Sequence, residues 1–183
     1  LEYAGDPNTR FQEIMNDFHE FENALYSGKE IDEYVDVAAL ARFVMVNQFI
    51  VNQELGHPKS VFLWKEDLSS AASKIIFGPV WDFDWGFGYE NTKSYFITGT
   101  ESSIFNSNMY SNAGYRFFTA LIDNKEFQRH YYKVWCEFVE NKSIEEVLRY
   151  IADYYGFAKE SYMHNAQEWG DNTDYAGMVP QMQ

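Results

Sequence analysis

Two carboxylates lie two residues apart in the stretch FGPVWDFDWGFG, residues 77–88, among aromatic residues and glycines. In an extended segment, side chains at i and i+2 face the same way, so Asp82 and Asp84 would present both carboxylates on one side. Paired hard oxygen ligands suit Mg²⁺ or Mn²⁺, which usually keep waters and bridge to substrate phosphates. The alternative is that the carboxylates accept hydrogen bonds from the turn that follows them. The spacing alone leaves both interpretations open.

A second polar cluster, NQELGHPKS at residues 52–60, follows a long apolar segment. Asn52 and Glu54 lie where that segment ends, and Glu54 has the chemistry of a general base or a metal ligand. His57 has the chemistry of a ligand or proton carrier, although a histidine before proline more often bonds its own turn. Lys59 is expected in solvent, and Ser60 is expected to begin a strand. Each residue therefore has an ordinary loop role beside its chemical one.

The elements that must position these residues are predicted from apolar spacing and stop signals. An apolar stripe predicts a helix over residues 10–26. Residues 36–53 are apolar nearly all the way round, so they predict a central buried helix that Asp36 caps. The segments 61–66 and 74–81 have the pattern of two short strands in a hairpin, and the paired carboxylates come directly after it.

The C-terminal half is predicted to be helical after a long polar loop over residues 89–112. Ser143 and Glu146 form a capping-box pattern, and Gly156 is predicted to separate the last two helices. The expected helices span residues 115–122, 125–141, 143–155 and 157–169. The predicted fold class is therefore α+β, mainly α with a small β-hairpin.

The composition excludes several classes of function. The chain has 183 residues, 19% of them aromatic, and a formal charge of −14. The negative charge disfavours binding to nucleic acid, and no apolar run approaches the roughly 20 residues of a membrane span. The single cysteine, Cys136, excludes an internal disulfide and a cysteine zinc cluster. The sequence contains no Walker A, H-E-x-x-H, G-x-S-x-G or complete G-x-G-x-x-G motif.

The order of the motifs resembles the spore-coat protein H (CotH) kinase family. An apolar helix ends in NQE, then come HPKS and the strand VFLWKE, and a second strand leads into GPVWDFDWGFG. The motif core of the resemblance covers about residues 31–90, and the helical remainder at 113–170 is compatible with it. The resemblance implies that residues 1–183 form one domain, similar to the C-terminal lobe of an atypical protein kinase.

The resemblance also implies phosphate transfer from ATP to protein serine residues with Mg²⁺ or Mn²⁺. Asp82 and Asp84 then correspond to metal ligands, because Asp84-Trp85-Gly86 is similar to the Asp-Phe-Gly pattern of ordinary kinases. The element around Asn52 and Glu54 resembles the catalytic loop, with Glu54 as the base and Asn52 as a supporting polar residue. The other residues of the cluster are assigned to cofactor binding: His57, Lys59 and Ser60.

Two departures from the family pattern qualify this assignment. Better-studied members carry an aspartate where Glu54 stands, and glutamate is one methylene longer. No glycine-rich loop and no strand lysine for the α- and β-phosphates precede the helices. We therefore expect a fragment whose N-terminal lobe and C-terminal end are missing and which is a poor kinase alone. By analogy, we expect a secreted or cell-surface protein.

Two other functions stay open. A D-x-D pair after a strand also holds the metal and the sugar nucleotide in many glycosyltransferases, although those folds need repeated β–α units before the motif. A secreted, aromatic-rich binding module would use Asp82 and Asp84 only structurally. Metal binding that depends on ATP would favour the kinase. Metal binding that depends on a sugar nucleotide would favour the transferase, and the absence of both would favour the binding module.

Overall fold

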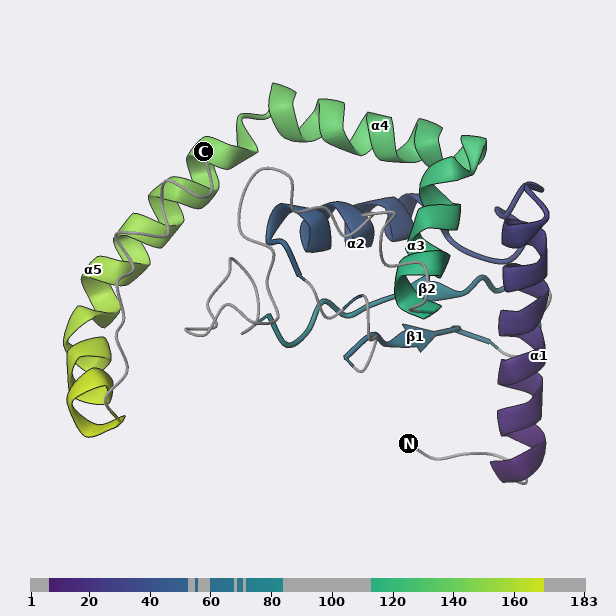
Figure 1. Ribbon diagram of the computed structural model, residues 1–183, viewed down its shortest axis with the longest axis horizontal. Coiled ribbons are helices and arrows are strands. Elements are labelled where there is room, and N and C mark those ends of the chain that lie inside the picture. The colour runs from purple at the N-terminus through teal and green to yellow at the C-terminus, as the bar shows by residue number, and fades with distance from the viewer. Residues whose placement is uncertain are drawn as a thin grey trace. The chain divides into compact units, whose positions relative to one another are not determined.

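The computed structural model describes residues 7–52, 55, 60–67, 69–70, 72–83 and 113–169 (Figure 1). It is mainly helical with one small antiparallel pair of strands, which confirms the predicted fold class. The chain divides into two compact units, Leu1–Val134 and Trp135–Gln183. The elements in chain order are α1 (Pro7–Tyr26), α2 (Val37–Phe49), β1 (Leu63–Trp64), β2 (Ile76–Phe77), α3 (Ala113–Asp123), α4 (Lys125–Glu140) and α5 (Ser143–Trp169).

Helix α2 is the central buried helix of the first unit, as its all-round apolar character predicts. The carboxylate of Asp36 accepts a hydrogen bond from the Ala39 amide at 2.9 Å, so the predicted N-cap is confirmed. The buried residues of the helix are Val37, Leu40, Ala41, Phe43, Val44, Met45 and Asn47. The single polar member of that set, Asn47, lies near the C-terminal end of the helix.

Replacing Asp36 with alanine should lower the free energy of unfolding by about 1 kcal/mol, because the Ala39 amide loses its acceptor. Asp36→Asn keeps an acceptor oxygen and should stay within about 0.5 kcal/mol of the original chain. Urea unfolding of the three proteins measures both differences. Equal losses in the two variants would contradict the capping role.

A cluster of phenylalanine rings joins α1, β2 and α3 in the first unit. The ring of Phe21 lies 6.3 Å from that of Phe77 and 5.7 Å from that of Phe117, edge to face in both cases. Phe77 also lies 5.7 Å from Phe43 of α2. Such pairs add about 0.5–1.5 kcal/mol each to the burial of apolar area. Phe77 therefore anchors the strand that leads to Asp82 against helices on several sides.

The predicted hairpin is present, but each of its strands is shorter than predicted. The paired residues are Leu63 with Phe77 and Trp64 with Ile76. The second strand ends after Phe77 because Gly78 has a positive φ of 136° and the following Pro79 has no amide hydrogen to donate. An isolated parallel bridge between Val35 and Ile75, which the sequence did not predict, ties the hairpin to the start of α2.

Two polar side chains at the corner between α3 and α4 hold the chain that precedes α2. The Oδ1 atom of buried Asn124 accepts hydrogen bonds from the amides of Glu126 and Phe127. Its Nδ2 atom donates to the Lys29 carbonyl at 2.9 Å, across a separation of 95 residues. The Glu126 carboxylate accepts a hydrogen bond from the Ile31 amide at 2.7 Å. Asn124 thus caps α4 and also fixes the approach to α2.

Helix α5 of the second unit runs without interruption from Ser143 to Trp169, so the predicted break at Gly156 is wrong. Glycine costs a helix about 1 kcal/mol relative to alanine, but Gly156 keeps a helical backbone with no positive φ. The predicted capping box is also wrong, because Ser143 is already helical and the Glu146 amide donates to the Lys142 carbonyl. Of the helices that the structure describes, none has the length and apolar character of a membrane span.

Candidate functional site

Helix α2 ends at Phe49, earlier than predicted, in a tight turn of the Schellman type. The Asn52 amide donates to the Asn47 carbonyl at 2.9 Å, and the Val51 amide donates back to the last turn. Val51 occupies the position that requires a left-handed backbone, with φ at 55°. Glycine is usual there, and a residue with a Cβ costs about 1–2 kcal/mol. The helix therefore gives way to the NQELGHPKS segment through a strained turn.

A pair of buried amide side chains lies inside this turn. Asn47 is 1% exposed and Asn52 is 3% exposed. The Nδ2 atom of Asn52 donates to Oδ1 of Asn47 at 2.8 Å, and Nδ2 of Asn47 donates to the Phe43 carbonyl at 2.8 Å. Buried amides that are bonded in this way rigidify the backbone that carries them. Asn52, a predicted supporting residue, thus lies in the interior with its amide nitrogen directed at α2.

Among the described residues, a hydrogen bond connects the two motif segments. The hydroxyl of Ser60 donates to Oδ2 of Asp82 at 3.1 Å, although the two residues lie 22 positions apart. Ser60 is half-buried and Asp82 is exposed. Ser60 was predicted as a cofactor contact, and the structure places its hydroxyl on the predicted metal ligand. The contact orients one oxygen of a carboxylate that faces solvent.

The backbone conformation of Asp82 differs from the extended geometry predicted from the sequence. Its φ is 63°, in the left-handed region, so the alternation of side chains expected for a strand does not pass through this residue. Aspartate and asparagine tolerate this conformation better than most residues. Non-glycine residues in such conformations cluster at functional sites, where the surroundings hold them. The direction of the carboxylate is thus set by the left-handed backbone of Asp82 and by the hydrogen bond from Ser60.

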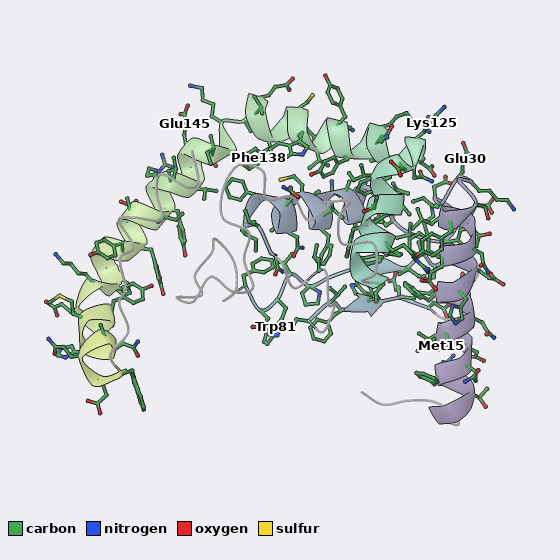
Figure 2. The ribbon with its side chains drawn as sticks, viewed as in Figure 1. Met15, Glu30, Trp81, Lys125, Phe138 and Glu145 are labelled. Carbon is green, nitrogen blue, oxygen red and sulfur yellow. The ribbon has the colours of Figure 1, made fainter. Side chains whose placement is uncertain are left out.

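Trp81 and Phe83, the residues on either side of Asp82 in the sequence, line a very small cavity. Its volume is about 10 Å³, which is room for no more than one water molecule. Trp81, one of its lining residues, is 61% exposed at the surface (Figure 2). The lining residues are Phe43, Asn47, Asn52, Leu55, Ser60, Val61, Trp81 and Phe83. The buried amides and the Ser60–Asp82 pair therefore form one packed region.

The predicted site residues Glu54, His57, Lys59 and Asp84 lie outside the described residues, so only Asn52, Ser60 and Asp82 can be placed. Within the described part of the chain, no three histidine, cysteine, aspartate or glutamate side chains are grouped to hold a metal ion. Mg²⁺ is usually held by one or two protein carboxylates together with waters and substrate phosphates. An exposed carboxylate with one oriented oxygen, as at Asp82, fits that mode of binding.

The sequence as a whole matches a known protein family. The sequence model of the CotH kinase protein family matches residues 2–183, almost the whole chain. The chain belongs to the CotH kinase family. Comparisons with curated proteins and with solved structures give no match. Membership of the CotH kinase family supports a kinase-like domain. The use of ATP and a divalent metal is a general feature of that family.

Sequence reasoning singled out the two motif segments of the candidate site but missed Asn47 and Val51. Asn47 is one of the few polar residues near the end of the apolar helix predicted over residues 36–53. Its distance of five residues from Asn52, across a helix end, was the available signal. Nothing in the residue type of Val51 indicates a left-handed backbone, because β-branched residues are rare there.

Proposed function

We propose that this chain carries the metal-binding and catalytic elements of a CotH-type protein kinase, which transfers phosphate from ATP to serine residues of a protein. The observation that carries the proposal is the hydrogen bond from Ser60 to Asp82, because it joins the two motifs of the family at one surface. Family membership over almost the whole chain supports the same reaction. A secreted or cell-surface location is part of the proposal by family analogy.

The proposed roles follow from what phosphoryl transfer requires. A bound Mg²⁺ or Mn²⁺ would neutralise charge on the phosphate oxygens, and the protein mainly supplies positioning. Asp82 would hold the metal, with Ser60 fixing the direction of one carboxylate oxygen. Asp84 is the second proposed ligand, and Glu54 would accept the proton of the substrate hydroxyl. Asn52 would keep the catalytic segment in place.

The nucleotide is proposed to be shared between two lobes. His57 and Lys59 are the proposed phosphate contacts of this chain, since both carry nitrogen donors beside the catalytic segment. The sequence contains no recognisable glycine-rich loop or strand lysine for the α- and β-phosphates. An N-terminal lobe of the same protein is therefore the proposed partner, and the phosphate acceptor is a second protein.

Calorimetric titration of Mg²⁺ and Mn²⁺, with and without ATP, tests the proposal on this chain and on a longer form of the protein. We expect saturable metal binding that ATP strengthens, at least in the longer form, and transfer of labelled γ-phosphate to serine. Metal binding strengthened by a sugar nucleotide instead would identify a transferase. Absence of metal and nucleotide binding in both forms would overturn the kinase and favour a binding module.

Replacing Ser60 with alanine should weaken the Mn²⁺·ATP complex by about 10-fold, as is usual when the partner that orients a metal ligand is removed. Ser69→Ala is a matched control, because the Ser69 hydroxyl donates to Asp67 at 2.7 Å in the hairpin turn. The control should bind Mn²⁺·ATP like the original chain. Equal affinities in all three proteins would show that Ser60 does not orient the metal ligand.

A further inference from the structure

Asn47 is buried in a helix that is otherwise lined with apolar residues, and the proposed reaction gives it no role. Its side chain is 1% exposed, so it cannot contact nucleotide or protein substrate. It nevertheless makes two side-chain hydrogen bonds, one to the Phe43 carbonyl and one from Asn52. A buried polar group is tolerated when both of its bonding atoms are satisfied, as they are here.

The amide of Asn47 connects the rigid helix to the strained turn that follows it. Its backbone carbonyl receives the Asn52 amide, and its side-chain oxygen receives the Asn52 side chain. Both bonds span Val51, whose left-handed backbone is unfavourable for a β-branched residue. A strained conformation persists only when its surroundings over-determine it. Asn47 supplies that constraint with two bonds to one residue.

The same side chain faces the region behind the proposed metal ligand. Asn47 and Asn52 line the small cavity together with Ser60, Trp81 and Phe83. The cavity has almost no free volume, so a displacement of the amides is transmitted to the residues that carry and flank Asp82. The direction of the Asp82 carboxylate therefore depends on the packing beneath it as well as on Ser60.

We propose that Asn47 is a positioning residue that locks the turn after α2 and thereby holds the Ser60–Asp82 pair in one geometry. The positioning itself stands on the described contacts, whereas its consequence for metal binding rests on the proposed function. Asn47 acts through Asn52 and through packing, without touching the metal, the nucleotide or the substrate.

Hydrogen exchange of the full chain tests the positioning directly. In Asn47→Ala we expect amide exchange to accelerate by about 10-fold in residues 60–67 and 76–83. The lost hydrogen bonds lower the free energy of local opening in these two segments, whereas exchange in α1 and α3 should stay unchanged. The matched control is Asn124→Ala, which removes another buried, hydrogen-bonded asparagine. Its exchange should accelerate around residues 29–32 and 124–127 instead.

A second variant distinguishes the loss of positioning from general unfolding of the chain. The double change Asn47→Leu with Asn52→Leu removes both polar groups, and such paired replacement by apolar groups can be nearly neutral for stability. It should reproduce the faster exchange of residues 76–83 while the chain stays folded. Acceleration confined to residues 43–52 in both Asn47 variants would overturn the proposal and make Asn47 a local helix-end residue only.

Binding of Mn²⁺·ATP to the same variants separates the proposal from the proposed function. We expect about 10-fold weaker binding in the Asn47 variants and unchanged binding in Asn124→Ala. Faster exchange at residues 76–83 without any metal binding by the original chain or its longer form would support the positioning role and overturn the proposed kinase function. Unchanged metal affinity in Asn47→Ala, in a chain that does bind, would overturn the link to the metal site.

Discussion

Replacing Asp82 with asparagine is expected to reduce the affinity for Mn²⁺·ATP by about 100-fold or more and to abolish phosphate transfer. Loss of an outer partner of a metal ligand already costs about 10- to 100-fold, and a direct ligand contributes at least as much. Asparagine suits this test because it also tolerates the φ of 63° at this position. The substitution therefore removes the charge and leaves the turn.

The control for Asp82→Asn is the same substitution at Asp67. Asp67 is also an exposed aspartate bonded to a serine, because Ser69 donates both its hydroxyl and its amide to Oδ1. The Ser69 hydroxyl, followed by its amide, holds the pKa of Asp67 below its usual value, so this carboxylate is charged at neutral pH. Asp67→Asn should leave Mn²⁺·ATP affinity unchanged. Equal affinities in the two variants would remove Asp82 from the metal site.

Replacing Phe21 with alanine should destabilise the first unit by about 3–5 kcal/mol, the usual cost of removing a fully buried phenylalanine. Phe21 is 0% exposed and contacts the rings of Phe77 and Phe117. The loss opens a cavity where α1, β2 and α3 meet, which the neighbouring rings can fill only in part. Because a domain is stable by only about 5–15 kcal/mol, a large part of the chain would unfold at moderate temperature.

Thermal and urea unfolding measure this effect, and Phe11→Ala is the control in the same helix. Phe11 is 58% exposed, so its removal should change the free energy of unfolding by no more than about 0.5 kcal/mol. Similar losses in Phe21→Ala and Phe11→Ala would contradict the assignment of the core. Addition of Mn²⁺·ATP should raise the midpoint of a folded chain if the proposed function is correct.

The contrast between the two experiments separates two kinds of contribution. Phe21 stabilises the unit that carries the candidate site, and its loss should reduce binding only through unfolding. Asp82 is exposed and accepts a hydrogen bond from Ser60, so its loss should reduce binding while the unfolding midpoint hardly moves. A chain in which the Asp82 substitution chiefly lowers stability would point to a structural carboxylate.

Features that depend on neighbours along the chain could be predicted from residue type and spacing. The apolar character of α2 predicted a buried helix, and Asp36 predicted its cap, because helix burial and capping follow from residue type and spacing. The hairpin followed from two short apolar segments with a turn between them. The motifs NQELGHPKS and GPVWDFDWGFG also indicated the family, which the match over residues 2–183 confirms.

The contacts that hold the candidate site together could not be predicted from the sequence. The bond between Ser60 and Asp82 and the packing beneath it join segments that are distant along the chain, so no local pattern contains them. The left-handed backbone of Val51 opposes its local preference and is held by the bonds between Asn47 and Asn52. Asp82 tolerates its left-handed backbone better, and its carboxylate is held by Ser60 from 22 residues away. Gly156 shows the reverse case, since a helix can continue through a glycine whose local signal is a stop. A local preference of about 1 kcal/mol is thus outweighed at Gly156 by the cooperative hydrogen bonding of a long helix, and at Asp82 a long-range contact acts on the side chain.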